Sequence, residues 1–338
     1  MRGLLATIAQ DREWGLATPR VTPQKRVRRI GRIAGSVEPL GPGGKMTKFS
    51  PSEAALEGFR LSREQPSSII IWSILYFAGT IALGLAFNVL AGPEFTRALN
   101  SSAIQKGDPA AYAHMFGRWW PAFIIITMVW TLFNSVLTGG IFRMALRPGE
   151  KGVAHLQFGK TEFRLAAVSA ILGIIGLFCI FTTYVLTIIL AKIAGGPLGI
   201  ISGFMLFAGV IWIGLRLMLV TPMTFEEEKI SLAQAWHLSK GHELSLLFMS
   251  ILSIVFWIIL VALLNTIGLA FISLGGGIGT ILHPSHFRPL SALALLVSFY
   301  LQALMSTLWV VMFTSPLAVA YRELKVDDAW KVGIWAKP

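Results

Sequence analysis

Six long apolar segments, separated by short polar connections, dominate the hydrophobic pattern of this chain. A helix of about 20 apolar residues is long enough to cross the hydrocarbon core of a bilayer. The pattern therefore predicts an all-α, polytopic membrane protein whose spans pair in sequence as three helical hairpins. The predicted spans are residues 69–90, 119–142, 165–191, 198–220, 246–272 and 290–320.

A shorter amphipathic pattern precedes the first span. Ser50 and Pro51 predict the start of a helix, and Pro66 predicts its end. The helix carries the apolar Ala55, Leu56 and Phe59 on one side and the charged Glu57, Arg60 and Arg63 toward the other. This distribution predicts a helix that lies flat at the membrane interface.

Similar tripeptides precede or open three of the spans, and they indicate a weak internal repeat. They are Phe59-Arg60-Leu61, Phe163-Arg164-Leu165 and Trp236-His237-Leu238. Each combines an aromatic residue, a basic residue or histidine, and a leucine. We therefore expect the segment around Trp236 to be a second interfacial element, and each hairpin to be led by such an element.

Composition and charge support a membrane protein and argue against a nucleic-acid partner. Hydrophobic residues make up 54% of the chain and charged residues only 14%, whereas soluble domains carry about 25% charged residues. Half of the net charge of +12 lies in residues 1–45, which hold nine Lys and Arg against three Asp and Glu. The rest lies mostly in connections, where Lys and Arg set membrane topology.

The polar, Pro- and Gly-containing residues 1–45 lack apolar periodicity, which predicts disorder. They are either a basic tail drawn to anionic lipid or an upstream misreading of a start at Met46, and we favour the second. Residues 46–325 are predicted to form the six-helix membrane domain. Residues 326–338 are predicted to form a cytoplasmic C-terminal tail.

The sidedness of the connections follows from their Lys and Arg content. Basic residues are more frequent before the first span, in the second and fourth connections, and after the last span. These are Arg60 and Arg63; Arg143, Arg147, Lys151, Lys160 and Arg164; Arg216, Lys229 and Lys240; and Arg322, Lys325, Lys331 and Lys337. The asymmetry predicts that both termini are cytoplasmic.

Two phrases support a family resemblance. One runs from Leu156-Gln157-Phe158-Gly159 to Thr161-Glu162-Phe163-Arg164-Leu165, and the other links Pro222-Met223-Thr224-Phe225 to Trp236-His237-Leu238-Ser239-Lys240-Gly241. Together they resemble a family of six-helix bacterial inner-membrane proteins of uncharacterised function. That family is similar to the membrane domain of glycerophosphoryl diester phosphodiesterases. The resemblance implies an inner-membrane location and supplies no catalytic residues, because the phosphodiesterase catalytic domain is a separate soluble barrel.

Polar residues recur at helical spacing inside two spans, and they are the candidate functional residues. They are Thr127, Thr131, Asn134 and Thr138 in the second span, and Ser298, Gln302 and Ser306 in the sixth. Buried polar groups in a bilayer are expensive, so each set should face the bundle interior. They would either hold helices together by hydrogen bonds or line a polar cavity near Asn134 and Gln302.

Other chemistry is not indicated. The spans lack a central Asp, Glu or Lys, and His283 and His286 have no carboxylate or cysteine partner nearby, so we predict no catalytic, cofactor-binding or metal-binding residues. Arg216, near the predicted cytoplasmic end of a span, either reaches the interface or pairs with Glu226 or Glu227. We expect a non-enzymatic structural or accessory protein, in contact with the bilayer and with a membrane protein partner. The alternative is a transporter or lipid-handling protein.

Overall fold

The computed structural model describes residues 49–147, 153–277 and 289–331. Within these ranges the chain is helical and contains no β-strand, which confirms the all-α prediction. The elements are α2 (Pro51–Glu64), α3 (Pro66–Leu99), α4 (Ser102–Gln105), α5 (Pro109–Leu146), the 3₁₀ turn η1 (Val153–His155), α6 (Lys160–Ala194), α7 (Gly196–Leu217), α8 (Val220–Glu227), α9 (Leu232–Leu238), α10 (Glu243–Leu274) and α12 (Pro289–Lys331). The predictions for residues 1–45 fall outside the described residues.

Six segments of the described chain are long and apolar enough to cross a membrane, as the sequence predicts. They correspond to α3, α5, α6, α7 with α8, α10 and α12, and each has at least 32 residues. Each of these segments extends beyond its predicted span because the turns that flank the apolar run are helical as well. In the fourth segment α7 ends at Leu217, and α8 continues to Glu227. Helix α12 continues through Pro316 to Lys331, so it includes part of the tail predicted for residues 326–338.

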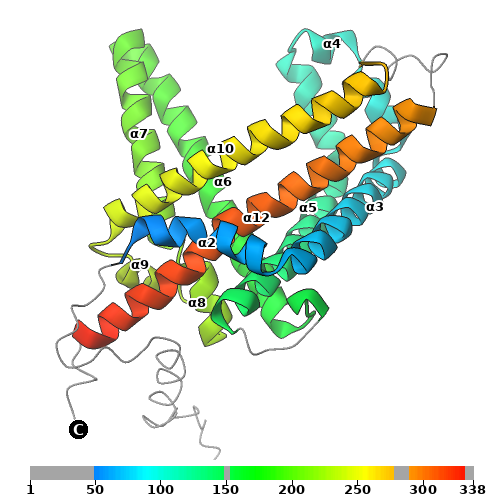
Figure 1. The fold of residues 1–338 in the computed structure, drawn as a ribbon. Coiled ribbons are helices and arrows are strands. Elements are labelled where there is room, and N and C mark those ends of the chain that lie inside the picture. Colours follow the sequence, from blue (N-terminus) through cyan, green and yellow to red (C-terminus); the bar gives the residue numbers. More distant parts are fainter. Residues whose placement is uncertain (1–48, 148–152, 278–288, 332–338) are drawn as a thin grey trace, which may run out of the picture. The chain divides into compact units, whose positions relative to one another are not determined.

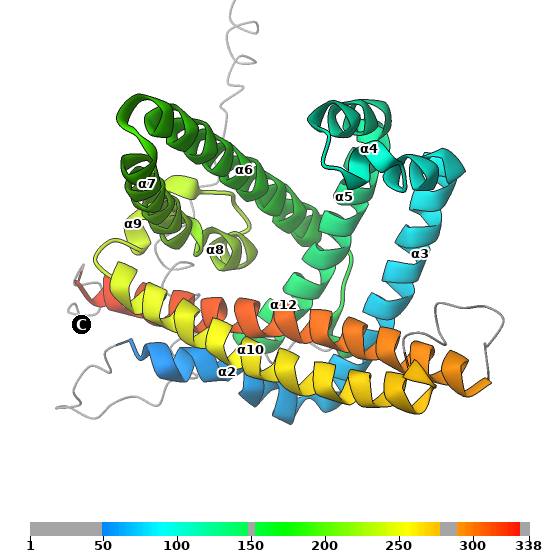
Figure 2. The same cartoon turned by 90° about the horizontal axis from the view of Figure 1, so that it is seen from above.

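The spanning helices pair as the three predicted hairpins. Helices α6 and α7 lie side by side, as do α10 and α12 (Figures 1 and 2). Small residues allow the close approach: Gly199 lies against Ala191, and Gly275 lies against Ala294. The hydroxyl of Ser291 also donates to the carbonyl oxygen of Gly275 at 2.6 Å, which ties α10 to α12 near the connection between them.

Helix α3 is kinked near its C-terminal end, shortly before the connection to α5. Gly92 has non-helical angles, with φ 69° and ψ 177°, immediately before Pro93. The indole Nε1 of Trp119 donates to the carbonyl oxygen of Ala91 at 3.0 Å, next to this interruption. Trp119 is therefore packed inside the hairpin and only 8% exposed, whereas the adjacent Trp120 is 57% exposed. Of these two tryptophans, Trp120 is the one exposed enough to contact a membrane interface, where Trp is enriched.

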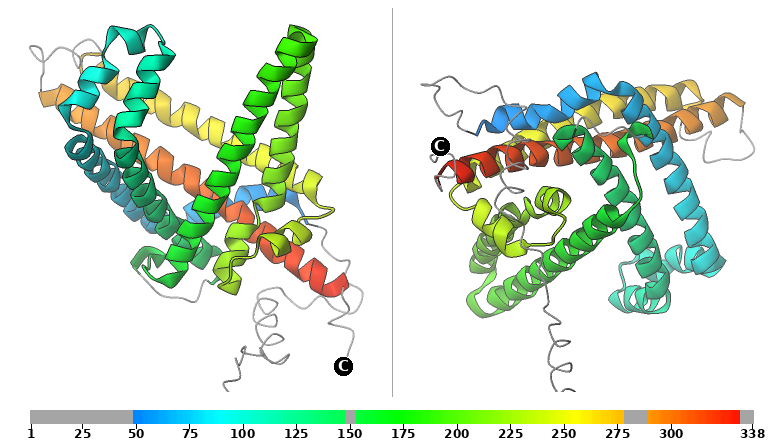
Figure 3. Two further views of the ribbon diagram at one scale, coloured as in Figure 1. Left: turned by 180° about the vertical axis from the view of Figure 1, so that it is seen from behind. Right: turned by 90° about the horizontal axis from the view of Figure 1, so that it is seen from below.

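Helix α2 is docked against α12 and α10, as the view from below shows (Figure 3). It begins at Pro51 and ends before Pro66, as predicted, although the Ser50 side chain does not cap it. The expected apolar side is wrong in part, because Leu56 is exposed. The buried residues are the small or aliphatic Ala54, Ala55, Gly58 and Leu61, together with Glu57, which was expected on the charged side. Small side chains pack on this buried face because they let the backbones of α2 and α12 approach closely.

The largest fully buried side chains gather at one end of the bundle, where α5 and α7 end and α6 and α10 begin. They include Trp72, Phe142, Leu219, Phe225 and Tyr321. We call this the packed end, and the charge rule predicts that it is cytoplasmic. At the opposite ends of the helices most large apolar side chains are exposed, which suits contact with lipid.

Candidate functional site

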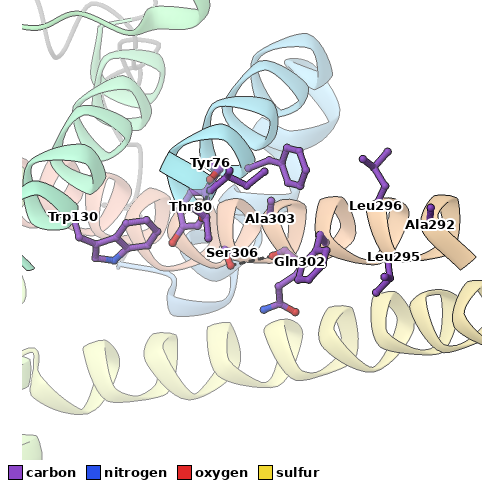
Figure 4. A pocket seen from close by; sticks show the side chains of 12 residues that line it. Tyr76, Thr80, Trp130, Ala292, Leu295, Leu296, Gln302, Ala303 and Ser306 are labelled. Atoms are coloured by element: carbon purple, nitrogen blue, oxygen red, sulfur yellow. Dashed lines mark hydrogen bonds between the residues drawn. The ribbon is translucent and has the colours of Figure 1, made fainter. Parts of the chain in front are cut away.

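A cavity of about 700 Å³ lies between α3, α5 and α12 (Figure 4). Cavities of about 300–1,000 Å³ are large enough to hold small organic ligands. Its lining is mostly apolar and aromatic and contains no charged side chain. The lining residues are Tyr76, Phe77, Thr80, Ile81, Trp130, Ala292, Leu295, Leu296, Phe299, Gln302, Ala303 and Ser306.

The cavity communicates with the surface that faces the bilayer. Of its lining residues, Phe299 is 63% exposed, and Ile81 and Leu296 are exposed as well. These residues lie within apolar segments that span the membrane, so the surrounding medium at this depth is hydrocarbon. A hydrophobic molecule could therefore enter sideways from the bilayer without crossing water.

A few polar groups line this apolar cavity, and most of them bond to their own helix. The hydroxyl of Thr80 donates to the carbonyl oxygen of Tyr76 at 2.8 Å. The hydroxyl of Ser306 donates to the carbonyl oxygen of Gln302 at 3.0 Å. The side-chain amide of Gln302 and the indole Nε1 of Trp130 make no hydrogen bond to another residue in the described ranges.

The structure brings two of the seven predicted residues to the cavity, Gln302 and Ser306. The prediction that both polar sets face the bundle interior is wrong for Gln302, which is exposed at the open side of the cavity. Asn134 does not line it; its Nδ2 donates to the carbonyl oxygen of Trp130 at 2.9 Å, one turn earlier in α5. Thr131 and Ser298 likewise bond to carbonyl oxygens of their own helices, at 2.8 and 2.7 Å. Thr127 is exposed and Thr138 is half-buried, both outside the cavity lining.

Bonding to the preceding turn explains why these residues do not gather. A Ser, Thr or Asn side chain in a helix can donate to the carbonyl oxygen four residues earlier, so it needs no partner on another helix. Sequence reasoning missed Tyr76, Phe77 and Trp130, which form the aromatic wall of the cavity. The available signal was the position of Tyr76 and Trp130, because Trp and Tyr in spans favour the interfaces and these two lie deeper.

A second feature missed by sequence reasoning is a buried ion pair at the packed end. Arg143, from the last turn of α5, pairs with Glu162, from the first turn of α6, and both side chains are almost fully buried. Arg143 Nη1 also donates to the carbonyl oxygen of His155 at 3.3 Å. The pair fastens the second hairpin to the first, although both residues lie in the polar connection predicted between the second and third spans.

Three consecutive glutamates fasten α8 to three different helices. Glu226 pairs with Arg147, just past the end of α5, at 3.4 Å. Glu227 pairs with Lys325 of α12 at 3.0 Å, and Glu228 pairs with Arg164 of α6 at 3.5 Å. The packed end is thus held together by ion pairs as well as by its apolar core.

Arg216 has a different partner from the two considered above. It pairs with Glu243, at the start of α10, and not with Glu226 or Glu227. Its guanidinium lies 5.1 Å from the ring centre of Trp212 and 5.5 Å from that of Trp236. The side chain is therefore enclosed by protein and does not extend into the interface.

The remaining sequence features are placed as follows. His283 and His286 lie outside the described residues. Within the described ranges no three His, Cys, Asp or Glu side chains are grouped as a metal site would need.

Fold and site together define an integral, multi-pass membrane protein with a lipid-facing apolar cavity. Comparison with known protein families, with characterised proteins and with solved structures gives no match.

Proposed function

We propose that this protein is a non-enzymatic lipid-handling protein of the bacterial inner membrane, with both termini in the cytoplasm. Its cavity would hold the hydrocarbon portion of a lipid. One observation carries this proposal: the cavity is lined by apolar and aromatic side chains, contains no charged residue, and opens at Phe299 and Leu296 toward the bilayer. The predicted resemblance to six-helix inner-membrane proteins of uncharacterised function supplies no catalytic residues, so it is compatible with a non-enzymatic role.

A structural or accessory role is the second candidate. It is favoured by the α6–α7 hairpin, whose aromatic residues Phe178, Phe181 and Phe204 are exposed. Such a surface suits either lipid or the helices of a membrane protein partner. This role would not require the cavity to be filled by a particular molecule.

Filling the cavity separates the two candidates. Thr80 lines the cavity and is exposed, so Thr80→Trp should occupy the space without disturbing buried packing. Thr266→Trp is the matched control, because Thr266 is an exposed threonine of α10 outside the cavity lining that makes the same bond to the preceding turn. The measurement is photo-crosslinking of the protein, reconstituted in vesicles, to a phospholipid with a photoactivatable acyl chain.

We expect crosslinks to peptides that contain residues 76–81 and 292–306, lost in Thr80→Trp and kept in Thr266→Trp. The same crosslinking pattern in both variants would reject the lipid-handling role. It would leave the structural or accessory role as the better account.

A further inference from the structure

The cavity contains two donors that the described part of the protein leaves without a partner. The Nε1 of Trp130 and the side-chain amide of Gln302 both line it, and neither bonds to another described residue. Trp130 lies midway along its predicted span, residues 119–142, and Gln302 lies well inside its own, residues 290–320. A polar group at this depth has no water to bond to, and leaving it unsatisfied is costly.

Oxygen acceptors on a bound molecule would remove this cost. Because indole nitrogen only donates and an amide both donates and accepts, the matching group is a carbonyl oxygen, with or without a hydroxyl. The acceptor must be uncharged, since the lining offers no cation to pair with a phosphate. The aromatic Tyr76, Phe77 and Phe299 beside these groups suit a planar or extended apolar body.

We propose that the cavity selects an uncharged lipid that carries carbonyl oxygens, and that Trp130 and Gln302 recognise these oxygens. This inference rests on the proposed function, to which it adds the class of ligand. A prenylated quinone and a diacylglycerol are both uncharged lipids with carbonyl oxygens. A phospholipid has the same ester carbonyl oxygens, but its phosphate adds a charge that no residue of the cavity lining balances.

The experiment uses three probes: decylubiquinone, dioleoylglycerol and dioleoylphosphatidylglycerol. Binding of each to the full-length protein in nanodiscs is measured by displacement of the photoactivatable acyl chain from the cavity peptides. The variants are Gln302→Leu and Trp130→Phe, which remove the polar groups but keep apolar volume. The controls are Asn88→Leu, an exposed amide of α3 outside the lining, and Trp120→Phe, an exposed tryptophan of α5.

We expect decylubiquinone or dioleoylglycerol to displace the acyl chain more effectively than dioleoylphosphatidylglycerol. The more effective of these two uncharged probes identifies the class of lipid that the cavity binds. Each cavity variant should weaken that probe by roughly two- to tenfold, the effect of losing one hydrogen bond. The two controls should bind as the wild type does. Thermal unfolding of every variant is measured alongside, so that a loss of fold is recognised.

Two results would overturn the inference. One is equal displacement by the charged and uncharged probes; the other is unchanged binding in folded Gln302→Leu and Trp130→Phe. In both cases the crosslinks to the cavity peptides would still be lost in Thr80→Trp if the proposed function holds. Absence of those crosslinks in the wild type would reject the proposed function itself.

Discussion

Arg143 and Glu162 form an ion pair whose side chains are only 5% and 1% exposed. Arg143 belongs to the first hairpin and Glu162 to the second, so the pair joins the two at the packed end. Two charges so well removed from water depend strongly on each other, because removing one takes away the interaction that offsets the desolvation of the other. The pair is therefore a sensitive point of the structure.

Removal of one charge from this pair is expected to be strongly destabilising. Glu162→Gln removes the carboxylate that lies against the buried guanidinium of Arg143, and breaking a buried ion pair costs about 3–5 kcal/mol. The measurement is thermal or denaturant-induced unfolding of the purified protein in detergent. The matched control is Glu228→Gln, because the Arg164–Glu228 pair is 37% and 50% exposed and exposed pairs contribute at most about 1 kcal/mol. Equal losses in the two variants would show that the Arg143–Glu162 pair is not buried as described.

Replacement of Arg216 by lysine should weaken the attachment of α7 to α9 and α10. Lysine keeps the charge opposite Glu243 but loses the planar group that lies over Trp212 and Trp236, at a cost of about 1–2 kcal/mol. Arg118→Lys is the control, since Arg118 also lies 5.4 Å from a tryptophan ring centre and pairs with a glutamate, but is exposed. The melting temperature of Arg216→Lys should fall, while that of Arg118→Lys should stay close to the wild type.

Two glycines of α7 should respond to alanine in opposite directions. A Cβ at Gly199 would lie 2.6 Å from the Cα of Ala191 in α6, so Gly199→Ala forces the hairpin apart. A Cβ at Gly209 meets no atom within 4 Å, and alanine there gains up to about 1 kcal/mol of helix propensity. Unfolding measurements should show Gly199→Ala destabilised and Gly209→Ala unchanged or stabilised. A stable Gly199→Ala would contradict the close packing of α6 on α7.

The charge bias of the connections predicts the sidedness of the packed end. A reporter enzyme that is active only in the cytoplasm should be active when fused after residue 338 and inactive when inserted near Lys106. A reporter active only outside the cytoplasm should give the reverse result. A C-terminus outside the cytoplasm would invert the arrangement and place the packed end on the opposite face.

The sequence alone determined the membrane class, the six spans and their pairing as hairpins. The physical reason is that backbone groups in hydrocarbon must bond within their own segment, so an apolar run of sufficient length specifies a helix without knowledge of its neighbours. The start of α2 at Pro51 and its end before Pro66 were also local, since proline fixes one backbone angle and lacks a donor. All of this information lies within a few residues of each position.

Only the tertiary structure decided which polar groups matter. Asn134 and Ser298 looked equivalent to Gln302 in sequence, yet they bond to their own helices while the Gln302 side chain lines the cavity. Arg216 pairs with Glu243 and not with Glu226 or Glu227, which are nearer in the sequence. Glu227 pairs with Lys325, which is 98 residues away in the sequence. These pairings depend on how separate helices pack and cross, and the periodicity of residues within one helix does not specify that packing.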